Sequence, residues 1–216
     1  LAAVGFMYPQ GYFHQHISAE GWQEEIYRQL NFNESPISPC AWPDVCGPLV
    51  PVPLAERIVH LAVWQVRIGR VNLYLLDTNV EENAEQDRHI SARLYGADEE
   101  ERLRQLIVLG IGGVRTLRLL GINPSVWHIN EDHTAFTMVE RLREAMEKGA
   151  SFGQSVEGIR ASTIFTTHTP IAAGHNIFPV QLIDRYASNF WKYLRIDRQT
   201  FLKLGQYDGL DTGRFS

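Results

Sequence analysis

Apolar positions are spaced differently in the two halves of the chain. In the first half they form short β-branched and aromatic runs, which predict strands over residues 1–8 and 11–18 on either side of a turn at Pro9-Gln10-Gly11. Residues 23–30 carry apolar positions at helical spacing and predict a short amphipathic helix. The chain is therefore expected to begin as two strands followed by one helix.

Three further segments complete the first half. Residues 36–53 hold six of the ten prolines, and because proline interrupts helices and sheet ladders, this segment is expected to be a connector without regular structure. Residues 58–77 contain two apolar runs separated by Arg67-Ile68-Gly69-Arg70, which predicts a β-hairpin. Residues 79–89 are acidic and polar and predict an exposed loop.

The second half alternates helical and strand-like patterns. Helical periodicity covers residues 99–120 and about 134–148, and short apolar runs at 125–130 and 162–167 predict strands. Two strands joined by a helix of this length favour a parallel sheet, whose ligands bind outside the carboxyl ends of the strands. The pattern therefore predicts an α/β fold with an inserted β-hairpin region.

Composition narrows the class of protein. The 216 residues are 44% hydrophobic and 21% charged, as is usual for a globular domain, and the net charge of −5 leaves no basic excess to bind a phosphate backbone. No apolar run approaches the roughly 20 residues that cross a bilayer, and no secretion signal opens the chain. We expect a cytoplasmic protein that binds neither nucleic acid nor membrane.

The cysteines and the first residues add two expectations. Cys40 and Cys46 lie in the proline-rich segment without the C-x-x-C spacing of a zinc site, so two free thiols are expected. The chain starts at Leu1 inside an apolar run and without an initiator methionine, which suggests that it was cut from a longer sequence.

Polar side chains follow both predicted strands of the second half. Asn130-Glu131-Asp132-His133 comes after the first strand, and His168 and Thr169 come after the second. Unpaired N–H groups at a strand-to-helix junction favour hydroxyl or anionic ligands. A helix start capped by Asp132, together with a structural histidine, explains the same residues without a ligand. Each segment alone leaves the choice open, whereas the two together predict one polar crevice.

Three other motifs are less specific. A zinc site would recruit His128, His133, His168 and Glu131, but there is no H-E-x-x-H spacing, and no metal is expected. The glycines of Gly110-Ile111-Gly112-Gly113 interrupt a helical pattern and are expected to let helices pack closely rather than bind a phosphate. Five aromatic residues could stack on sugars but are expected to fill the core, namely Tyr8, Tyr12, Phe13, Trp22 and Trp64.

Six segments, read in order, carry a family resemblance. They are Val4 to Phe13, Gly21-Trp22-Gln23, Ala92 to Asp98, Leu109 to Arg115, Val126 to Phe136, and Phe165 to Pro170. In order and spacing they resemble the α-glucan phosphorylases, particularly the short bacterial and archaeal type, over nearly the whole chain.

The resemblance implies a fold and a reaction. The family has two Rossmann-like domains of the GT-B glycosyltransferase type, and residues 1–216 resemble part of the amino-terminal domain, with the carboxy-terminal cofactor domain absent. The family reaction transfers the terminal glucose of an α-1,4-glucan to inorganic phosphate and gives glucose 1-phosphate. Pyridoxal phosphate is held by a lysine of the other domain. The resemblance therefore implies that this chain binds no cofactor and is inactive by itself.

The resemblance also implies site residues. His168 resembles the family histidine that contacts the transferred glucose, with its main chain near the developing positive charge, and it is the expected catalytic residue. The expected substrate-binding residues are Asp98, which resembles an acidic residue of the family's gate loop, and Arg102, Asn130, Glu131, His133 and Thr169.

Two positions depart from the short-type family pattern. Asp132 stands where that pattern has glycine, and Leu106 follows Gln105 where it has glutamate. A carboxylate in place of glycine adds volume and charge beside the sugar pocket, and the missing glutamate removes an ion-pair partner of Arg102. Both departures are expected to change the geometry of the pocket.

Other functions stay open at the level of the sequence. The chain could be a stand-alone glucan-binding or regulatory module, or part of a related nucleotide-sugar glucan synthase, although no residues for a nucleotide site stand out. A homodimer is a further expectation, because a missing covering domain would leave apolar surface exposed.

Overall fold

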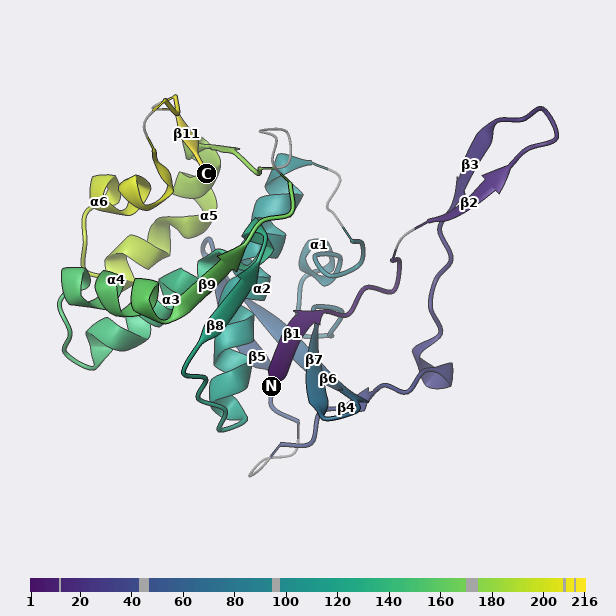
Figure 1. Ribbon diagram of the computed structural model, residues 1–216, viewed down its shortest axis with the longest axis horizontal. Helices are drawn as coiled ribbons and strands as arrows, with labels where there is room; N and C mark the ends of the chain where they lie inside the picture. Colours follow the sequence, from purple (N-terminus) through teal and green to yellow (C-terminus); the bar gives the residue numbers. More distant parts are fainter. Residues whose placement is uncertain (12, 43–46, 95–97, 170–174, 208, 212) are drawn as a thin grey trace. The chain divides into compact units, whose positions relative to one another are not determined.

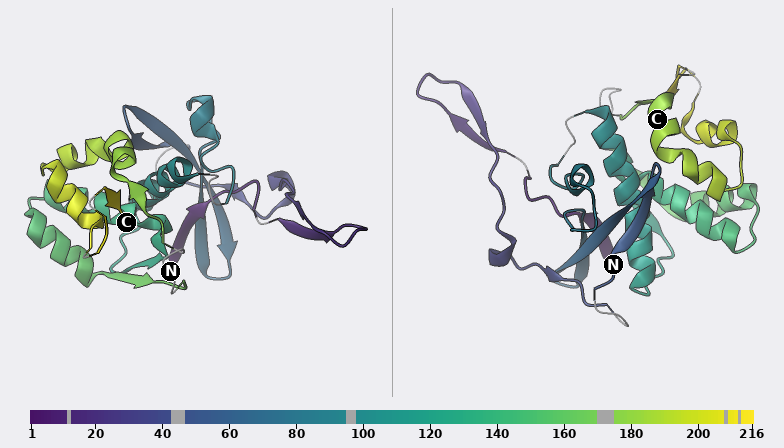
Figure 2. Two further views of the ribbon diagram at one scale, coloured as in Figure 1. Left: turned by 90° about the horizontal axis from the view of Figure 1, so that it is seen from above. Right: turned by 180° about the vertical axis from the view of Figure 1, so that it is seen from behind.

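The computed structural model describes residues 1–11, 13–42, 47–94, 98–169, 175–207, 209–211 and 213–216 (Figures 1 and 2). Cys46 and Tyr12 thus lie outside the described residues. The chain divides into two compact units. Unit 1 comprises Leu1–Val50 and His60–Gly96, and unit 2 comprises Pro51–Val59 and Ala97–Ser216.

Unit 1 is built on a mixed sheet. Its strands lie in the order β1 (Ala2–Phe6), β7 (Val71–Asp77), β6 (Arg57–Ile68) and β4 (Ser38–Pro39), with β1 parallel to β7 and the other neighbours antiparallel. β6 and β7 form the predicted hairpin, which is closed by the two residues Gly69-Arg70. The φ of Gly69 is 60°, a value that such a turn requires and that glycine adopts without strain.

The structure corrects the predictions for the start of the chain. β1 and a second strand, β2 (His14–Ile17), are present, but β1 pairs with β7, whereas β2 pairs antiparallel with β3 (Gln23–Ile26). The helix predicted over residues 23–30 is therefore wrong. Gly21 has a φ of 86°, and the Ser18 hydroxyl accepts two backbone N–H groups of the turn. These contacts stabilise a turn between β2 and β3, so residues 23–26 pair with β2 in a hairpin instead of forming a helix.

The early aromatic residues were expected to fill the core, but those that the structure describes do not. Trp22 is 75% exposed, and Tyr8, Phe13 and Trp64 are only partly buried. The Trp64 indole N–H donates to Asp77 Oδ2 at 3.3 Å, and such a polar contact keeps the ring at the border of the sheet. The core of unit 1 consists mainly of alternating sheet side chains, including Phe6, Leu61, Val63, Tyr74 and Leu76.

The proline-rich segment contains regular structure, contrary to prediction. β5 (Val50–Leu54) runs through Pro51 and Pro53 and pairs with β6. Among the described residues β5 pairs with no other strand. An edge strand leaves every second N–H without a ladder partner, so prolines spaced two residues apart are tolerated there.

The segment 79–89 is more ordered than predicted. It contains the short helix α1 (Glu85–Arg88), and Asn83 is buried. Asn83 Nδ2 donates to the carbonyl oxygens of His60 and Thr78 at 2.7 and 2.8 Å, and Asn83 Oδ1 accepts from the His60 N–H at 2.8 Å. Because its hydrogen bonds replace those to water, the polar side chain is buried without an unmet donor or acceptor.

Unit 2 follows the predicted alternation of helices and strands. α2 (Glu99–Leu119), β8 (Trp127–Asn130), α3 (Phe136–Glu147) and β9 (Thr163–Thr166) confirm the four predicted elements. β8 and β9 are parallel, as the pattern predicted, and lie side by side in Figure 1. The α/β class is thereby confirmed, whereas the Rossmann-like layout of a complete sheet stays a prediction.

Several elements of the chain were not predicted. α4 begins with a capping box, in which the Ser151 side chain accepts the Gln154 N–H and Gln154 reaches back to Ser151, a signal that is readable in the sequence. The additional elements are α4 (Phe152–Ala161), α5 (Val180–Tyr193), α6 (Arg198–Leu202), β10 (Phe178–Pro179), β11 (Arg214–Phe215), and the 3₁₀ turns η1 (Phe32–Glu34), η2 (Asp132–Thr134) and η4 (Lys203–Gly205).

Among the described residues no helix is both long and apolar enough to cross a lipid bilayer.

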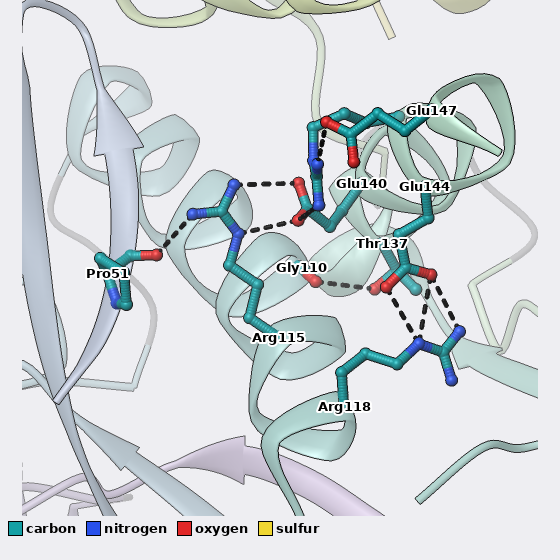
Figure 3. Close-up of polar contacts among 9 residues, drawn as sticks. Pro51, Gly110, Arg115, Arg118, Thr137, Glu140, Glu144 and Glu147 are labelled. Atoms are coloured by element: carbon teal, nitrogen blue, oxygen red, sulfur yellow. Dashed lines mark hydrogen bonds and ion pairs between the residues drawn. The ribbon is translucent and has the colours of Figure 1, made fainter. Parts of the chain in front are cut away.

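α2 and α3 cross closely at Gly110 (Figure 3). A Cβ atom on Gly110 would lie 2.6 Å from Thr137 N and 2.7 Å from Phe136 C, and both neighbours are backbone atoms that cannot move aside cheaply. Thr137 Oγ1 donates to the Gly110 carbonyl at 3.3 Å. The expectation that the glycines of α2 allow close helix packing is thus confirmed at Gly110.

Buried charges join the same two helices (Figure 3). Glu140 is 1% exposed and lies 2.7 Å from Arg115 Nε and 2.8 Å from Arg143 Nη2. Burial alone would raise the pKa of Glu140, but the hydrogen bonds from Arg143 and Arg115 outweigh it and hold the pKa below its ordinary value. Since Arg115 also donates to the Pro51 carbonyl at 2.7 Å, it ties α3 to both α2 and β5. α3, whose start follows the candidate site, is therefore held firmly.

Candidate functional site

The carboxyl ends of β8 and β9 bring the two polar segments to one sheet edge. Asn130 lies opposite Thr166 in the parallel pair. The Glu131 N–H donates to the Thr166 carbonyl at 2.8 Å, which extends the pairing beyond β8. The residues that follow each strand therefore leave the sheet side by side, and their side chains can act on one ligand.

Glu131 has a backbone conformation that is adopted almost only by glycine. Its φ is 56° and its ψ is −169°. Its carboxylate accepts a hydrogen bond from the main-chain N–H of His168. This bond is the main reason that the pKa of Glu131 lies below its ordinary value, and a hydrogen bond with the Thr167 side chain adds to the effect. An ionised carboxylate is thus held against the main chain of His168.

The ring of His168 is fixed by Asn130. Nε2 of His168 lies 2.9 Å from Asn130 Oδ1. An amide oxygen can only accept, so Nε2 is the donor, and in the neutral ring Nδ1 is left as an acceptor. Both residues are exposed, and a ligand can reach them from solvent.

A second group of contacts links three segments of unit 2. Asp132 Oδ2 accepts from the main-chain N–H of Asn176 at 2.9 Å and from its side-chain amide at 2.8 Å. Asn176 Oδ1 in turn accepts from Arg102 Nη1 at 2.9 Å. The other Asp132 oxygen lies 3.6 Å from His133 Nδ1. One chain of polar contacts therefore connects α2, the β8 to α3 junction and the residues before β10.

Two predicted site residues make only local hydrogen bonds. The Asp98 carboxylate accepts from the Glu101 N–H at 2.7 Å and caps α2. The Thr169 carbonyl accepts from Thr167 Oγ1 at 3.4 Å. The Asp98 carbonyl also accepts from the Arg102 N–H at 3.0 Å, as part of the backbone of α2. Within the described part of the chain, neither Asp98 nor Thr169 has a side-chain hydrogen bond to the other predicted site residues.

Asp132 has a different role from the helix cap that was considered for it. The residue before α3 is Ala135, and no side chain caps this helix. The carboxylate of Asp132 instead binds Asn176, a residue that the sequence did not indicate. An asparagine before the apolar pair Ile177-Phe178 is too common a pattern to identify a partner 44 residues away.

The histidines do not gather as a zinc site would require. His128 Nε2 lies 2.7 Å from Thr166 Oγ1, whereas the His168 ring contacts Asn130. Across the residues that the structure describes, no three or more His, Cys, Asp or Glu side chains are placed to hold a metal ion together.

Comparison with known proteins shows what the chain resembles. No protein-family model matches it. Over 206 residues, 95% of its length, it is 43% identical to a maltodextrin phosphorylase of Thermococcus litoralis. It is 39% identical over 205 residues to a glycogen phosphorylase of Aquifex aeolicus, again 95% of its length, and 40% identical over 196 residues, or 88%, to one of Mycobacterium tuberculosis. The chain spans 24%, 30% and 23% of these relatives, about a quarter of their length. The resemblance read from the motifs is thereby confirmed.

Proposed function

The chain is homologous over nearly its whole length to one segment of the maltodextrin and glycogen phosphorylases, and from this premise we propose that it is the sugar-side portion of an α-1,4-glucan phosphorylase. The proposed parent is a cytoplasmic GT-B enzyme that transfers terminal glucose to inorganic phosphate and releases glucose 1-phosphate. The observation that carries the proposal is the joint fixation of the His168 main chain by Glu131 and of its ring by Asn130. Both contacts lie at the carboxyl ends of parallel strands, where open sheets bind ligands.

His168 is the proposed contact of the glucose that is transferred. Cleavage of the glycosidic bond builds positive charge on the sugar ring, and dipoles that are oriented beforehand stabilise this charge. The hydrogen bond from the His168 N–H to Glu131 orients the main chain for this task. A neutral imidazole held by Asn130 can bind a sugar hydroxyl without adding positive charge. The main chain and the imidazole of His168 then need to move less when the transition state forms.

The remaining predicted residues are proposed to bind the substrate around this centre. Arg102, through Asn176, and His133 both contact Asp132, the residue after Glu131, and both are suited to donate hydrogen bonds to sugar hydroxyls. Asp98 at the start of α2 and Thr169 after β9 are proposed to line the entrance, a role that rests on the family resemblance.

Pyridoxal phosphate, which the family resemblance implies, does not fit the residues of this site. The cofactor is held through a lysine amine, and the chain carries only Lys148, Lys192 and Lys203, all exposed. Lys148 follows the end of α3 opposite to the site, and a helix of 12 residues is about 18 Å long. Lys192 lies in the last turn of α5, and Lys203 lies beyond α6. We therefore assign the cofactor to another part of the parent polypeptide.

Kinetics of His168→Ala in the longer native polypeptide test the proposed function. Loss of one transition-state contact is expected to lower kcat/KM for phosphorolysis of maltoheptaose by about 10²-fold, measured as release of glucose 1-phosphate. His89→Ala replaces an exposed histidine of unit 1 and is the control that should keep the wild-type rate.

The outcomes separate the competing functions. An unchanged rate in His168→Ala, with wild-type melting behaviour, would remove His168 from the site. If the wild-type polypeptide binds maltoheptaose but performs no phosphorolysis, a glucan-binding module becomes the better description. Transfer of glucose from a nucleotide sugar in the same assay would instead indicate a glucan synthase.

A further inference from the structure

One carboxylate beside the candidate site binds a segment that is distant in the sequence. Both hydrogen bonds to Asp132 Oδ2 come from Asn176, one from its main chain and one from its side chain, at 2.9 and 2.8 Å. Hydrogen bonds to an ionised acceptor are shorter and stronger than those between neutral groups. Asp132 therefore fixes both the path of the chain at residues 175–177 and the orientation of the Asn176 side chain.

Asn176, held in this way, orients the side chain of Arg102. The side-chain amide is planar, so holding its nitrogen also sets the direction of Oδ1, which accepts from Arg102 Nη1 at 2.9 Å. Arg102 is exposed, and a long exposed side chain has many rotamers of similar energy. The contact with Asn176 selects one of them. The position of this guanidinium therefore depends on Asp132.

The same junction carries the strained residue of the site. Glu131, directly before Asp132, has the φ of 56° and holds the His168 N–H. A strained backbone persists only where surrounding contacts determine it. Asp132 supplies such contacts on one side of Glu131, and the bond from the Glu131 N–H to Thr166 supplies another on the opposite side.

We propose that Asp132 is a positioning residue, which holds Asn176 and thereby orients Arg102 and residues 175–177 at the border of the candidate sugar site. The proposal rests on the proposed function only in naming a glucan as the ligand. Glycine or alanine at this position lacks the acceptor, so Arg102 and the segment would lose their restraint. Since Asp132 acts on the border of the site and has no hydrogen bond to His168, its removal should weaken substrate binding more than the chemical step.

Amide hydrogen exchange in the 216-residue chain tests the contact itself. In Asp132→Ala the Asn176 amide is expected to exchange about tenfold faster, because its acceptor is lost. Asp132→Asn keeps an acceptor oxygen and should restore part of the protection. Asp211→Ala is the matched control, because Asp211 accepts a loop N–H, that of Gly213 at 2.9 Å, elsewhere in unit 2. This control should leave exchange at Asn176 unchanged.

Kinetics in the longer native polypeptide test the positioning role. Asp132→Ala is expected to raise KM for maltoheptaose by about three- to tenfold with kcat nearly unchanged, the pattern of lost ground-state binding. Asn176→Ala should have a similar effect. The double variant should be little worse than either single variant, because both remove the same chain of contacts.

Each outcome bears on the proposal. Unchanged exchange at Asn176 in Asp132→Ala would overturn it, and so would faster exchange with unchanged KM, because the contact would then serve the fold alone. If the wild-type polypeptide shows no phosphorolysis, the proposed function fails separately, and calorimetric affinity for maltoheptaose replaces KM. Equal affinities of the wild type and Asp132→Ala would then refute the positioning role.

Discussion

At the scale of single residues, Glu131 shows how a local cost can serve a site. Its φ of 56° is unfavourable for any residue with a Cβ, yet it places the carboxylate against the His168 N–H. A glycine would relieve the strain but would leave that N–H without its acceptor. The combination is expected where the orientation of a main-chain segment matters more than the local backbone energy.

The pKa of Glu131 tests which part of His168 this carboxylate holds. Because the main cause of the lowered pKa is the main-chain N–H, His168→Ala should keep most of the shift. The titration of the Glu131 side-chain carbon, followed by NMR in the isolated chain, should have its midpoint below the ordinary glutamate value in both proteins. A lowered folded-state pKa means that this contact stabilises the fold above the unfolded pKa and is lost as pH falls through the folded one. A return to the ordinary glutamate value in His168→Ala would show that the imidazole is the partner instead.

Residue-level roles differed in how far the sequence could reveal them. The segments with Asn130, Glu131 and His168 could be located, because strand ends are visible in the apolar pattern and parallel strands end at one edge. The partnership of Asp132 with Asn176 could not be predicted, because neither side chain has a local signal and the contact forms only in the folded unit. The burial of Asn83 was not predicted either, because its three hydrogen-bond partners are backbone groups of His60 and Thr78, which come together with it only in the folded unit.

At the scale of elements, the predictions held where a segment carries its own period or turn signal. α2 is a helix of 21 residues whose apolar positions recur at helical spacing on both sides of its glycines, and Gly69 marks the turn of the β6 and β7 hairpin. The predictions failed where the structure of a segment depends on its pairing with another segment. β3 is a strand because β2 folds back on it, and β5 is a strand despite Pro51 and Pro53 because it pairs on one side.

The crossing of α2 and α3 predicts opposite effects for two glycine substitutions. Gly110→Ala gains about 1 kcal/mol of helix propensity, but its Cβ meets backbone atoms at 2.6 and 2.7 Å, so a net loss of about 2 kcal/mol is expected. Gly158→Ala in α4 meets nothing within 4 Å and should stabilise by about 0.5 to 1 kcal/mol. Urea unfolding of the two variants provides the comparison. Equal shifts of both midpoints would mean that the helices do not approach as closely as described.

At the scale of the whole molecule, the proposed sugar site lacks the groups that would hold the proposed cofactor. It spans about a quarter of its relatives, and the candidate site within unit 2 offers amide, carboxylate, imidazole and guanidinium groups. Such groups bind and orient a polyol. The proposed group transfer to phosphate also needs the cofactor that the site residues do not fit. Binding and catalysis should therefore be separable in this protein.

The separation can be measured by treating the isolated chain and the proposed longer polypeptide in parallel with pyridoxal phosphate. The isolated chain is expected to show no phosphorolysis and no stoichiometric pyridoxal phosphate absorbance, because its three lysines are exposed and lie at the carboxyl ends of α3, α5 and α6. Borohydride reduction followed by peptide mapping should give only sparse labelling of the exposed Lys148, Lys192 and Lys203. The longer polypeptide should instead give one stoichiometric adduct on a lysine outside residues 1–216. A single complete adduct within this chain would place the cofactor here and contradict the separation of binding from catalysis, since the site would then have to include a lysine from the carboxyl end of α3, α5 or α6.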